Sequence, residues 1–240
     1  MTANPSARFP STAWSCVRAA QDPAHPDFIA ALNRLITAYW KPVFHFLRAA
    51  GRPAAPAEDL TQEFFQRFLT KGWLRPADAQ RGRFRHFLCT VLKRFAYSRT
   101  ARANQQEAFE QGFVSVHRLI QDSDRAWEPP ARETPEEAFQ RQWKAGVLEA
   151  VRRNLQAYYE GLDKPAQRQR FELFAAYHFA ERSSEQPTQD ALAARFGVSR
   201  EAVRYALDAV GRRYERFLRQ EVRDQVGTEE EIEPELADLR

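Results

Sequence analysis

Apolar residues recur at three- and four-residue steps along most of this chain, and two-residue alternation is almost absent. A period of three to four places apolar side chains on one face of an α-helix, whereas a half-buried strand needs a period of two. The one strand-like run, residues 113–116, is short. Glycine is scarce, and neither glycine-rich phosphate-binding pattern, GxGxxG or GxxxxGK[ST], occurs. The sequence therefore predicts an all-α fold.

The helical period is clearest in a few long segments. The first begins near Asp27 and is expected to end at Tyr39-Trp40-Lys41, with Pro42 beginning or kinking the next helix, because proline is tolerated in a first helical turn. The other expected helices cover residues 57–71, 136–155 and 164–179, and a further helix is expected within the stretch 81–102. Both cysteines, Cys16 and Cys89, lie among apolar residues at helical spacing. We therefore expect them to be buried free thiols.

Residues 81–102, RGRFRHFLCTVLKRFAYSRTAR, hold seven arginines or lysines and no acidic residue. On a helix, Phe84, Phe87 and Phe95 share the apolar face, so these rings should belong to the core. A solvated helix face usually mixes both signs of charge, and one with only cations repels itself unless a polyanion neutralises it. We therefore expect nucleic-acid contact, with an anionic membrane surface as the alternative. The expected contact residues are Arg83, Arg85, His86, Lys93, Arg94 and Tyr97.

Residues 188–210, TQDALAARFGVSREAVRYALDAV, fit a helix-turn-helix. Gly197 suits a turn that needs a positive φ, and Ser199 is an expected N-cap of the second helix. The exposed N-terminal side of that helix is the part that reaches base edges in the major groove of DNA. A helical hairpin in a protein-only module is the alternative. The expected DNA-binding residues are Ser199, Arg200, Glu201, Arg204, Tyr205 and Asp208.

These motifs, in this order, resemble those of bacterial RNA polymerase sigma factors of the extracytoplasmic-function (ECF) group. DLTQEFFQRFL at 59–69 looks like the helix of sigma domain 2 that binds core polymerase. The basic stretch 81–102 looks like the segments that open and read the −10 promoter element, and 188–210 matches the −35 reader of sigma domain 4. TPEEAFQRQW at 134–143, the opening of the helix that precedes the helix-turn-helix, also fits this family. Near the N-terminus, AWSCVRAA followed by AYWKPVFHFLR resembles long-chain members of the group from planctomycete-like bacteria.

The resemblance implies a sigma factor without catalysis or a cofactor of its own. It would bind core RNA polymerase and promoter DNA, both as duplex and as a melted strand, and an anti-sigma factor could regulate it. The core-binding positions that the resemblance implies are Asp59, Gln62, Glu63, Phe64 and Arg67. In the −10 helix, Arg94 and Ser98 stand where family members often have Asn and Asp. These two departures leave the base preference at the −10 element open.

The expected organisation is two helical domains joined by a flexible linker. Residues 1–11 should be disordered, 12–104 should form the sigma domain 2-like bundle, 105–134 the linker, and 135–224 the helix-turn-helix domain. The acidic tail 225–240 is expected to be a disordered solubilising segment. A second interpretation is that the tail screens the basic DNA-binding face until polymerase binds.

Two other functions are compatible with parts of the pattern. A free-standing helix-turn-helix regulator would explain 188–210 but not the 59–102 constellation. An enzyme would need a site such as Asp59 and Glu63 beside His45 or His86, but the five histidines show no metal-ligand spacing such as HExxH. We therefore expect neither an enzyme nor a metal site. Without a signal-peptide core or a long apolar run, a cytoplasmic protein without membrane contact is expected.

Overall fold

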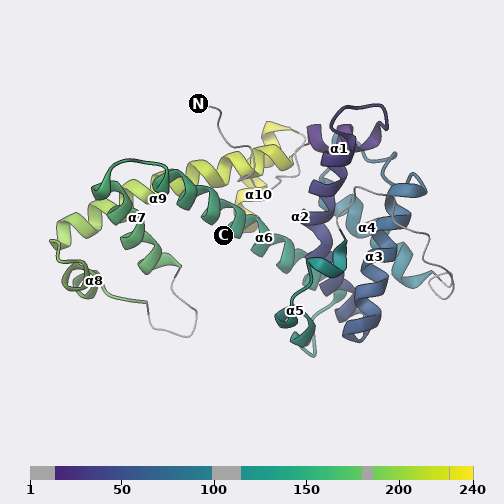
Figure 1. The fold of residues 1–240 in the computed structure, drawn as a ribbon, viewed down its shortest axis with the longest axis horizontal. Helices are drawn as coiled ribbons and strands as arrows, with labels where there is room; N and C mark the ends of the chain where they lie inside the picture. The colour runs from purple at the N-terminus through teal and green to yellow at the C-terminus, as the bar shows by residue number, and fades with distance from the viewer. Residues whose placement is uncertain (1–13, 99–114, 180–185, 227, 240) are drawn as a thin grey trace. The chain divides into compact units, whose positions relative to one another are not determined.

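A computed structural model describes residues 14–98, 115–179, 186–226 and 228–239 of the chain (Figure 1). Within these ranges all regular secondary structure is helical, and no strand occurs. The all-α prediction is therefore confirmed. The strand-like run 113–116 falls largely outside the described residues, and the N-terminal segment 1–11 does so entirely.

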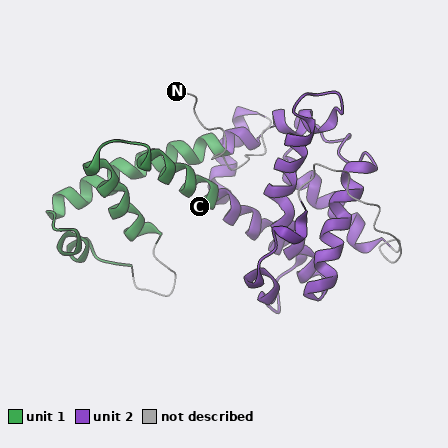
Figure 2. Ribbon diagram, viewed as in Figure 1, with its two compact units in different colours: residues 1–8, 148–221 green, residues 9–147, 222–240 purple. Residues whose placement is uncertain are grey.

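The chain divides into two compact units, which Figure 2 shows in green and purple. Unit 1 contains residues 148–221, and unit 2 contains residues 9–147 together with 222–240. The division falls inside the two longest helices, α6 (Pro135–Glu160) and α9 (Arg200–Gln225). The sequence instead suggested a division within 105–134, and the described part of that segment belongs to unit 2.

The core of unit 2 is built by α1 (Trp14–Gln21), α2 (Phe28–Ala49), α3 (Ala54–Thr70) and α4 (Phe84–Tyr97). Helix α2 packs against the other three. Phenylalanine rings join the helices: Phe64 of α3 lies 5.5 Å from Phe95 of α4, and Phe84 of α4 lies 5.5 Å from Tyr39 of α2, measured between ring centroids. Aromatic pairs at this spacing add to the stabilisation from buried area alone.

Pro42 neither ends nor begins a helix, because it lies inside α2, which is 22 residues long. A proline inside a helix removes one backbone hydrogen bond and usually bends or breaks the helix. Here the residues on both sides of Pro42 are buried, among them Tyr39, Val43 and Phe46. The packing of these residues outweighs the tendency of proline to break a helix. The periodicity of the sequence alone could not predict this outcome.

The described part of the expected linker, residues 115–134, is not an extended connection. It contains a short 3₁₀ helix, Val116–Arg118, and α5 (Asp122–Ala126), and both contact α3. Val116 and Ile120 are buried there. The prolines and acidic residues give this segment the composition of a linker, but a few apolar and polar contacts with α3 fix its course.

Unit 1 combines the second half of α6 with α7 (Pro165–His178), α8 (Gln189–Phe196) and most of α9. Two small apolar clusters hold it together. The first contains Leu155, Tyr159, Phe174 and Val210, and the second contains Leu173, Leu192, Val203 and Ala206. Helix α9 contributes to both clusters, so its orientation within unit 1 is fixed by the packing of α6, α7 and α8.

The acidic tail also differs from its expected disorder, because residues 232–239 form α10 (Ile232–Leu239) in unit 2. Ile232, Leu236 and Leu239 are buried and recur at helical spacing. The acidic composition concealed this short apolar stripe.

Candidate nucleic-acid interface

The helix-turn-helix of unit 1 has the local geometry that its sequence predicts. The Thr188 hydroxyl accepts a hydrogen bond from the Ala191 backbone N–H at 3.1 Å and so caps α8. Gly197 ends α8 with φ of 65°, a left-handed conformation that favours glycine. The Ser199 hydroxyl accepts from the Ala202 N–H at 3.2 Å and caps α9. Turn and caps fix the direction in which α9 begins.

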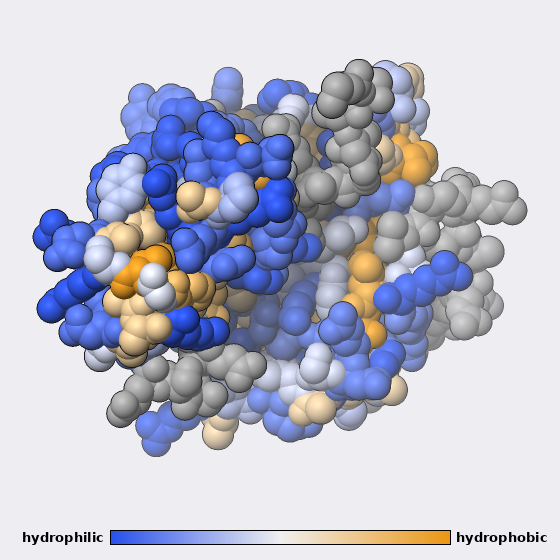
Figure 3. Space-filling model, turned by 60° about the vertical axis from the view of Figure 1, so that its left-hand side comes forward, coloured by the Kyte–Doolittle hydropathy of each residue, from blue (hydrophilic) through white to orange (hydrophobic). Residues whose placement is uncertain are grey.

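Helix α9 separates into a packed side and an open side, as expected. Val203, Ala206 and Val210 are buried within unit 1, and Leu207 is partly buried. The predicted DNA-binding residues Ser199, Arg200, Glu201, Arg204, Tyr205 and Asp208 are all exposed. Hydrophilic residues cover most of the unit 1 surface that faces the viewer in Figure 3. The structure therefore brings all six predicted residues to the surface near the start of one helix.

Charged neighbours modulate this surface. A hydrogen bond from a backbone N–H at the start of α9, followed by one from Ser199, lowers the pKa of Glu201. Arg200 lies 3.5 Å from the carboxylate of Asp190 on α8, and Asp208 pairs with Arg212 one turn further along α9. Glu201 therefore stays ionised at neutral pH and can accept a hydrogen bond from cytosine.

Arg170 joins this surface without having been singled out in the sequence. Its guanidinium lies over the ring of Tyr205, 4.8 Å from the centroid, in a cation–π contact. Arg170 belongs to α7, and nothing in its own sequence neighbourhood indicates that it meets α9. It adds positive charge beside Tyr205, whose side chain is 53% exposed.

Within the basic stretch 81–102, residues 84–97 form α4, and Arg83 directly precedes this helix. Phe84, Leu88, Leu92 and Phe95 are buried, so the prediction that the rings belong to the core is confirmed for Phe84 and Phe95. Phe87 is only partly buried. The cations of the stretch that lie in 99–102 fall outside the described residues.

Arg83 and Arg85 do not lie on an open face. Arg85 is 5% exposed and pairs with Glu235 of α10, while its guanidinium stacks over the Trp143 ring at 4.0 Å. Arg83 also pairs with Glu235, and Asp238 lies 3.1 Å from Arg83 and 3.2 Å from Arg85. Helix α10 therefore covers the two residues through which we expected DNA contact. Helical geometry of the stretch alone could not show that carboxylates about 150 residues later along the chain neutralise them.

The remaining predicted residues of α4, His86, Lys93, Arg94 and Tyr97, are exposed. Lys93 pairs with Glu136 at 2.6 Å, and this hydrogen bond raises the pKa of Lys93 and lowers that of Glu136. Partial desolvation of the exposed ring, together with the nearby Arg85 and Arg83, lowers the pKa of His86. Lys93 and Arg94 can therefore present positive charge to a ligand, and Tyr97 can present one aromatic ring.

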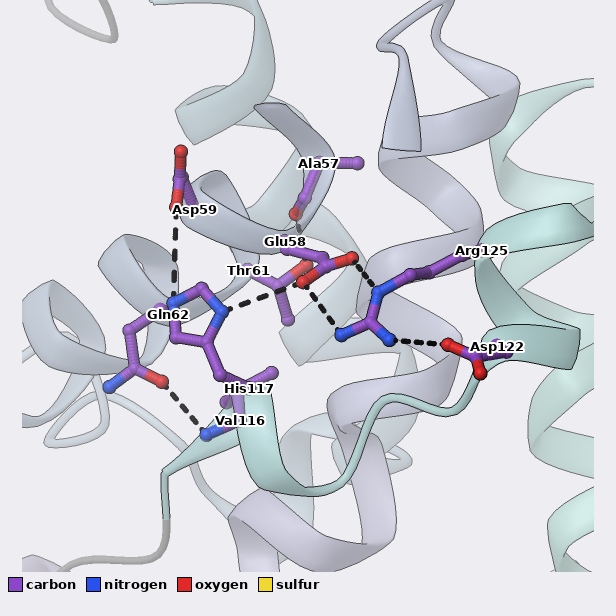
Figure 4. Close-up of polar contacts among 9 residues, drawn as sticks. All are labelled: Ala57, Glu58, Asp59, Thr61, Gln62, Val116, His117, Asp122 and Arg125. Carbon is purple, nitrogen blue, oxygen red and sulfur yellow. Dashed lines mark hydrogen bonds and ion pairs between the residues drawn. The ribbon is translucent and has the colours of Figure 1, made fainter. Parts of the chain in front are cut away.

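The predicted core-binding helix α3 is partly covered by residues 115–126, as the close-up in Figure 4 shows. Glu58 accepts hydrogen bonds from Arg125 at 2.6 and 3.3 Å, and His117 lies 3.5 Å from the same carboxylate. The bonds from Arg125 lower the pKa of Glu58. Asp59, by contrast, is 80% exposed, and its carboxylate lies 3.8 Å from the His117 ring.

The other four predicted core-binding residues differ in accessibility. The Gln62 side chain accepts a hydrogen bond from the Val116 backbone N–H at 2.8 Å. Glu63 and Arg67 pair with each other at 2.5 Å, one helical turn apart. Phe64 is fully buried and packs in the aromatic core, so it supports the helix rather than facing a partner. Of the five, Asp59 is the most open to another protein.

Buried titratable groups elsewhere in unit 2 show packing rather than a reactive site. Burial, reinforced by Arg141 and Lys41, lowers the pKa of His45 to about 3, so this ring is neutral at neutral pH. Cys16 and Cys89 are buried and free, as predicted, and burial raises the pKa of both thiols, that of Cys89 to about 11. Where the structure describes side chains, no group of three potential metal ligands converges.

Among the described helices, none is long and apolar enough to cross a membrane. We compared the chain with models of known protein families, with curated proteins and with solved structures, and none of the three comparisons gave a match. The functional argument therefore depends on the residues themselves and on the resemblance of the motifs described above.

Proposed function

We propose that this chain is a sigma factor, which binds core RNA polymerase, recognises −35 and −10 promoter elements and promotes DNA opening. The carrying observation is the exposed start of α9, where Arg200, Arg204 and Tyr205 follow a glycine turn and a serine cap. Arginine in this position suits guanine in the major groove, and the helix N-terminus suits phosphate.

The order of the motifs supports a sigma factor over other DNA-binding proteins. Asp59 is exposed on α3, upstream of α4 with its exposed Lys93, Arg94 and Tyr97. An exposed ring among cations suits an unpaired base and its phosphates. A sigma factor needs both a duplex reader and a surface for the opened strand, because it opens DNA by binding the melted state more tightly.

A free-standing helix-turn-helix regulator is the second candidate. One observation favours it: Arg83 and Arg85 are neutralised by α10, which leaves the start of α9 as the more open arginine surface. Such a regulator would bind duplex DNA without polymerase. Polymerase binding separates the two candidates.

The test is co-elution with bacterial core RNA polymerase on size exclusion at low salt. We expect the wild-type chain to co-elute and Asp59→Lys to weaken binding at least about ten-fold, because charge reversal at a close interfacial contact costs several kcal/mol. Asp59 is a cleaner position than Glu63, whose reversal would also break the pair with Arg67. Asp163→Lys, an equal charge change at an exposed residue of unit 1, is the matched control.

Absence of co-elution, with the protein folded by circular dichroism, would contradict the sigma factor and favour the regulator. Equal binding by wild type and Asp59→Lys would show that the Asp59 side of α3 does not contact polymerase, although the chain still binds it.

A further inference from the structure

Helix α10 carries a carboxylate inside its buried stripe. Ile232, Glu235, Leu236 and Leu239 lie at positions i, i+3, i+4 and i+7, and all four are buried. Glu235 is only 1% exposed. A charged side chain in the middle of an apolar helix face is costly unless it meets a partner of opposite charge. The position of Glu235 therefore depends on what α10 docks against.

The partners of Glu235 are the two arginines that open the basic stretch. Glu235 pairs with both Arg83 and Arg85, and Asp238, one turn later, lies 3.1 and 3.2 Å from the same two guanidinium groups. Two carboxylates thus bridge two guanidinium groups. Arginine binds carboxylate and phosphate through the same planar fork of N–H donors, so the carboxylates occupy the positions that phosphates would take.

Stability alone is a weak reason for this arrangement. A buried ion pair contributes little net stability, because desolvation offsets most of the attraction, and apolar residues of similar size often stabilise more. The 81–102 stretch itself contains no acidic residue, and among the described residues the carboxylates that pair with Arg83 and Arg85 come from the tail. Once α10 has left, Arg83 and Arg85 are free to bind another anionic group.

We propose that α10 is an autoinhibitory helix, which holds Arg83 and Arg85 by phosphate-like contacts and must leave before nucleic acid can bind them. The inference rests on the proposed function, since it assigns the basic stretch to nucleic acid. Undocking would expose both guanidinium groups at the start of α4, the helix that also carries the exposed Lys93, Arg94 and Tyr97. The Trp143 ring, now under Arg85, would remain as its stacking partner.

The test compares full-length Glu235→Gln with Glu230→Gln. Both changes remove one negative charge from the tail, but Glu230 is exposed on the short helical turn that precedes α10. The probe is a fluorescein-labelled single-stranded oligothymidine, titrated by anisotropy over a range of salt concentrations. If α10 is docked about 90% of the time, releasing it raises the apparent affinity about ten-fold.

We expect this gain for Glu235→Gln and less than about a two-fold change for Glu230→Gln, because one surface charge contributes little. The slope of log affinity against log salt should also steepen by about 1.4 in Glu235→Gln, since each phosphate contact on a single strand adds about 0.7. Adding Arg85→Met to Glu235→Gln should return part of the gain. Equal affinity and slope in Glu235→Gln and wild type would overturn the inference.

A second variant covers the case in which Glu235→Gln does not fold. Asp238 is half exposed, so Asp238→Asn leaves no uncompensated buried charge and should fold. We expect it to raise affinity by a smaller amount, about three-fold, because one of the two bridging carboxylates remains. No gain in folded Asp238→Asn would overturn the inference.

The same titrations separate this inference from the proposed function. If the wild-type chain binds the oligonucleotide and neither tail variant changes that binding, autoinhibition fails and the nucleic-acid interface stands. If neither the wild type nor any folded variant binds at low salt, the assignment of the basic stretch to nucleic acid fails, and autoinhibition fails with it.

Discussion

The start of α9 and the start of α4 each carry two arginines close together, but their surroundings are opposite. Arg200 and Arg204 are exposed on unit 1, where the carboxylate of Asp190 on α8 lies 3.5 Å from Arg200. Arg83 and Arg85 are held by α10 in unit 2, and Arg85 is buried. In the sequence the α4 stretch is the more basic of the two. A cluster of cations in a sequence therefore need not be a cationic surface, because distant residues can supply the counter-charge.

The largest effect is expected at the ion pairs between α10 and the arginines Arg83 and Arg85, where removing one partner should destabilise the docked helix. Arg85→Met leaves Glu235 buried with one cation fewer, which costs about 3 kcal/mol and should favour undocking of α10. Amide hydrogen exchange of residues 232–239 should then accelerate about 100-fold, because local opening becomes easier. Arg94→Met, at an exposed position on the same helix, should leave that exchange rate unchanged. Unchanged protection in Arg85→Met would show that apolar packing alone holds the helix.

Acidification should destabilise unit 2 through His45. Its folded-state pKa of about 3 lies below the ordinary value of 6.5, because the ring is buried near cations. Between these pH values the unfolded state takes up a proton that the folded state does not, so stability is full above pH 6.5 and falls as pH falls. The loss from this group reaches about 2 kcal/mol at pH 5.

Urea unfolding followed by tryptophan fluorescence measures this effect, since all five tryptophans lie in residues 14–143 and therefore in unit 2. His45→Gln, which keeps a polar group beside Gln142, should show a smaller loss between pH 7 and pH 5. An identical pH dependence in the variant and the wild type would exclude His45 as the cause.

Substitutions at the exposed start of α9 should change the affinity for DNA rather than the stability of the fold. Arg204→Ala should weaken duplex DNA binding about ten-fold and lower the salt slope by about 1, as expected for the loss of one arginine contact. Arg152→Ala removes an arginine of unit 1 that pairs with Glu149, and should have little effect. Equal losses in both variants would indicate general charge attraction instead of an interface at α9.

The smallest effect concerns the turn that aims α9. Gly197→Ala places a side chain at φ of 65°, which costs about 1 kcal/mol. Gly211→Ala should have the opposite sign and stabilise unit 1 by up to about 1 kcal/mol, because its helical site has only an ordinary contact with Phe174 at 3.7 Å. Thermal unfolding monitored by circular dichroism compares the two, and a shared sign would contradict the assignment of the turn.

Local patterns were sufficient wherever neighbours in the sequence are also neighbours in space. The glycine turn, the Ser199 cap and the buried side of α9 follow from residues 188–210 alone, and the structure confirms their geometry. The helical stripes of α3 and α4 were also predictable, including the burial of Phe84 and Phe95. In each case a three-to-four-residue period fixes which side chains meet.

Composition gave the wrong prediction for segments whose structure depends on contacts with residues far away in the sequence. The linker-like residues 115–134 dock on α3 through Val116 and Arg125, and the acidic tail folds into α10 around Glu235. Arg170 joined the exposed face of α9 without any local signal. Each of these contacts joins residues more than 30 positions apart, and no periodicity within either segment records the other.

The sequence by itself determined an all-helical chain, the positions of its main helices and the local geometry of the helix-turn-helix, because backbone hydrogen bonding and apolar periodicity act over a few residues. Only the tertiary structure decided that α2 continues through Pro42, that part of α3 is covered, and that Arg83 and Arg85 are neutralised while Arg200 and Arg204 stay exposed. The physical reason is that burial and charge pairing depend on which segments pack together, and that choice is made by the whole chain.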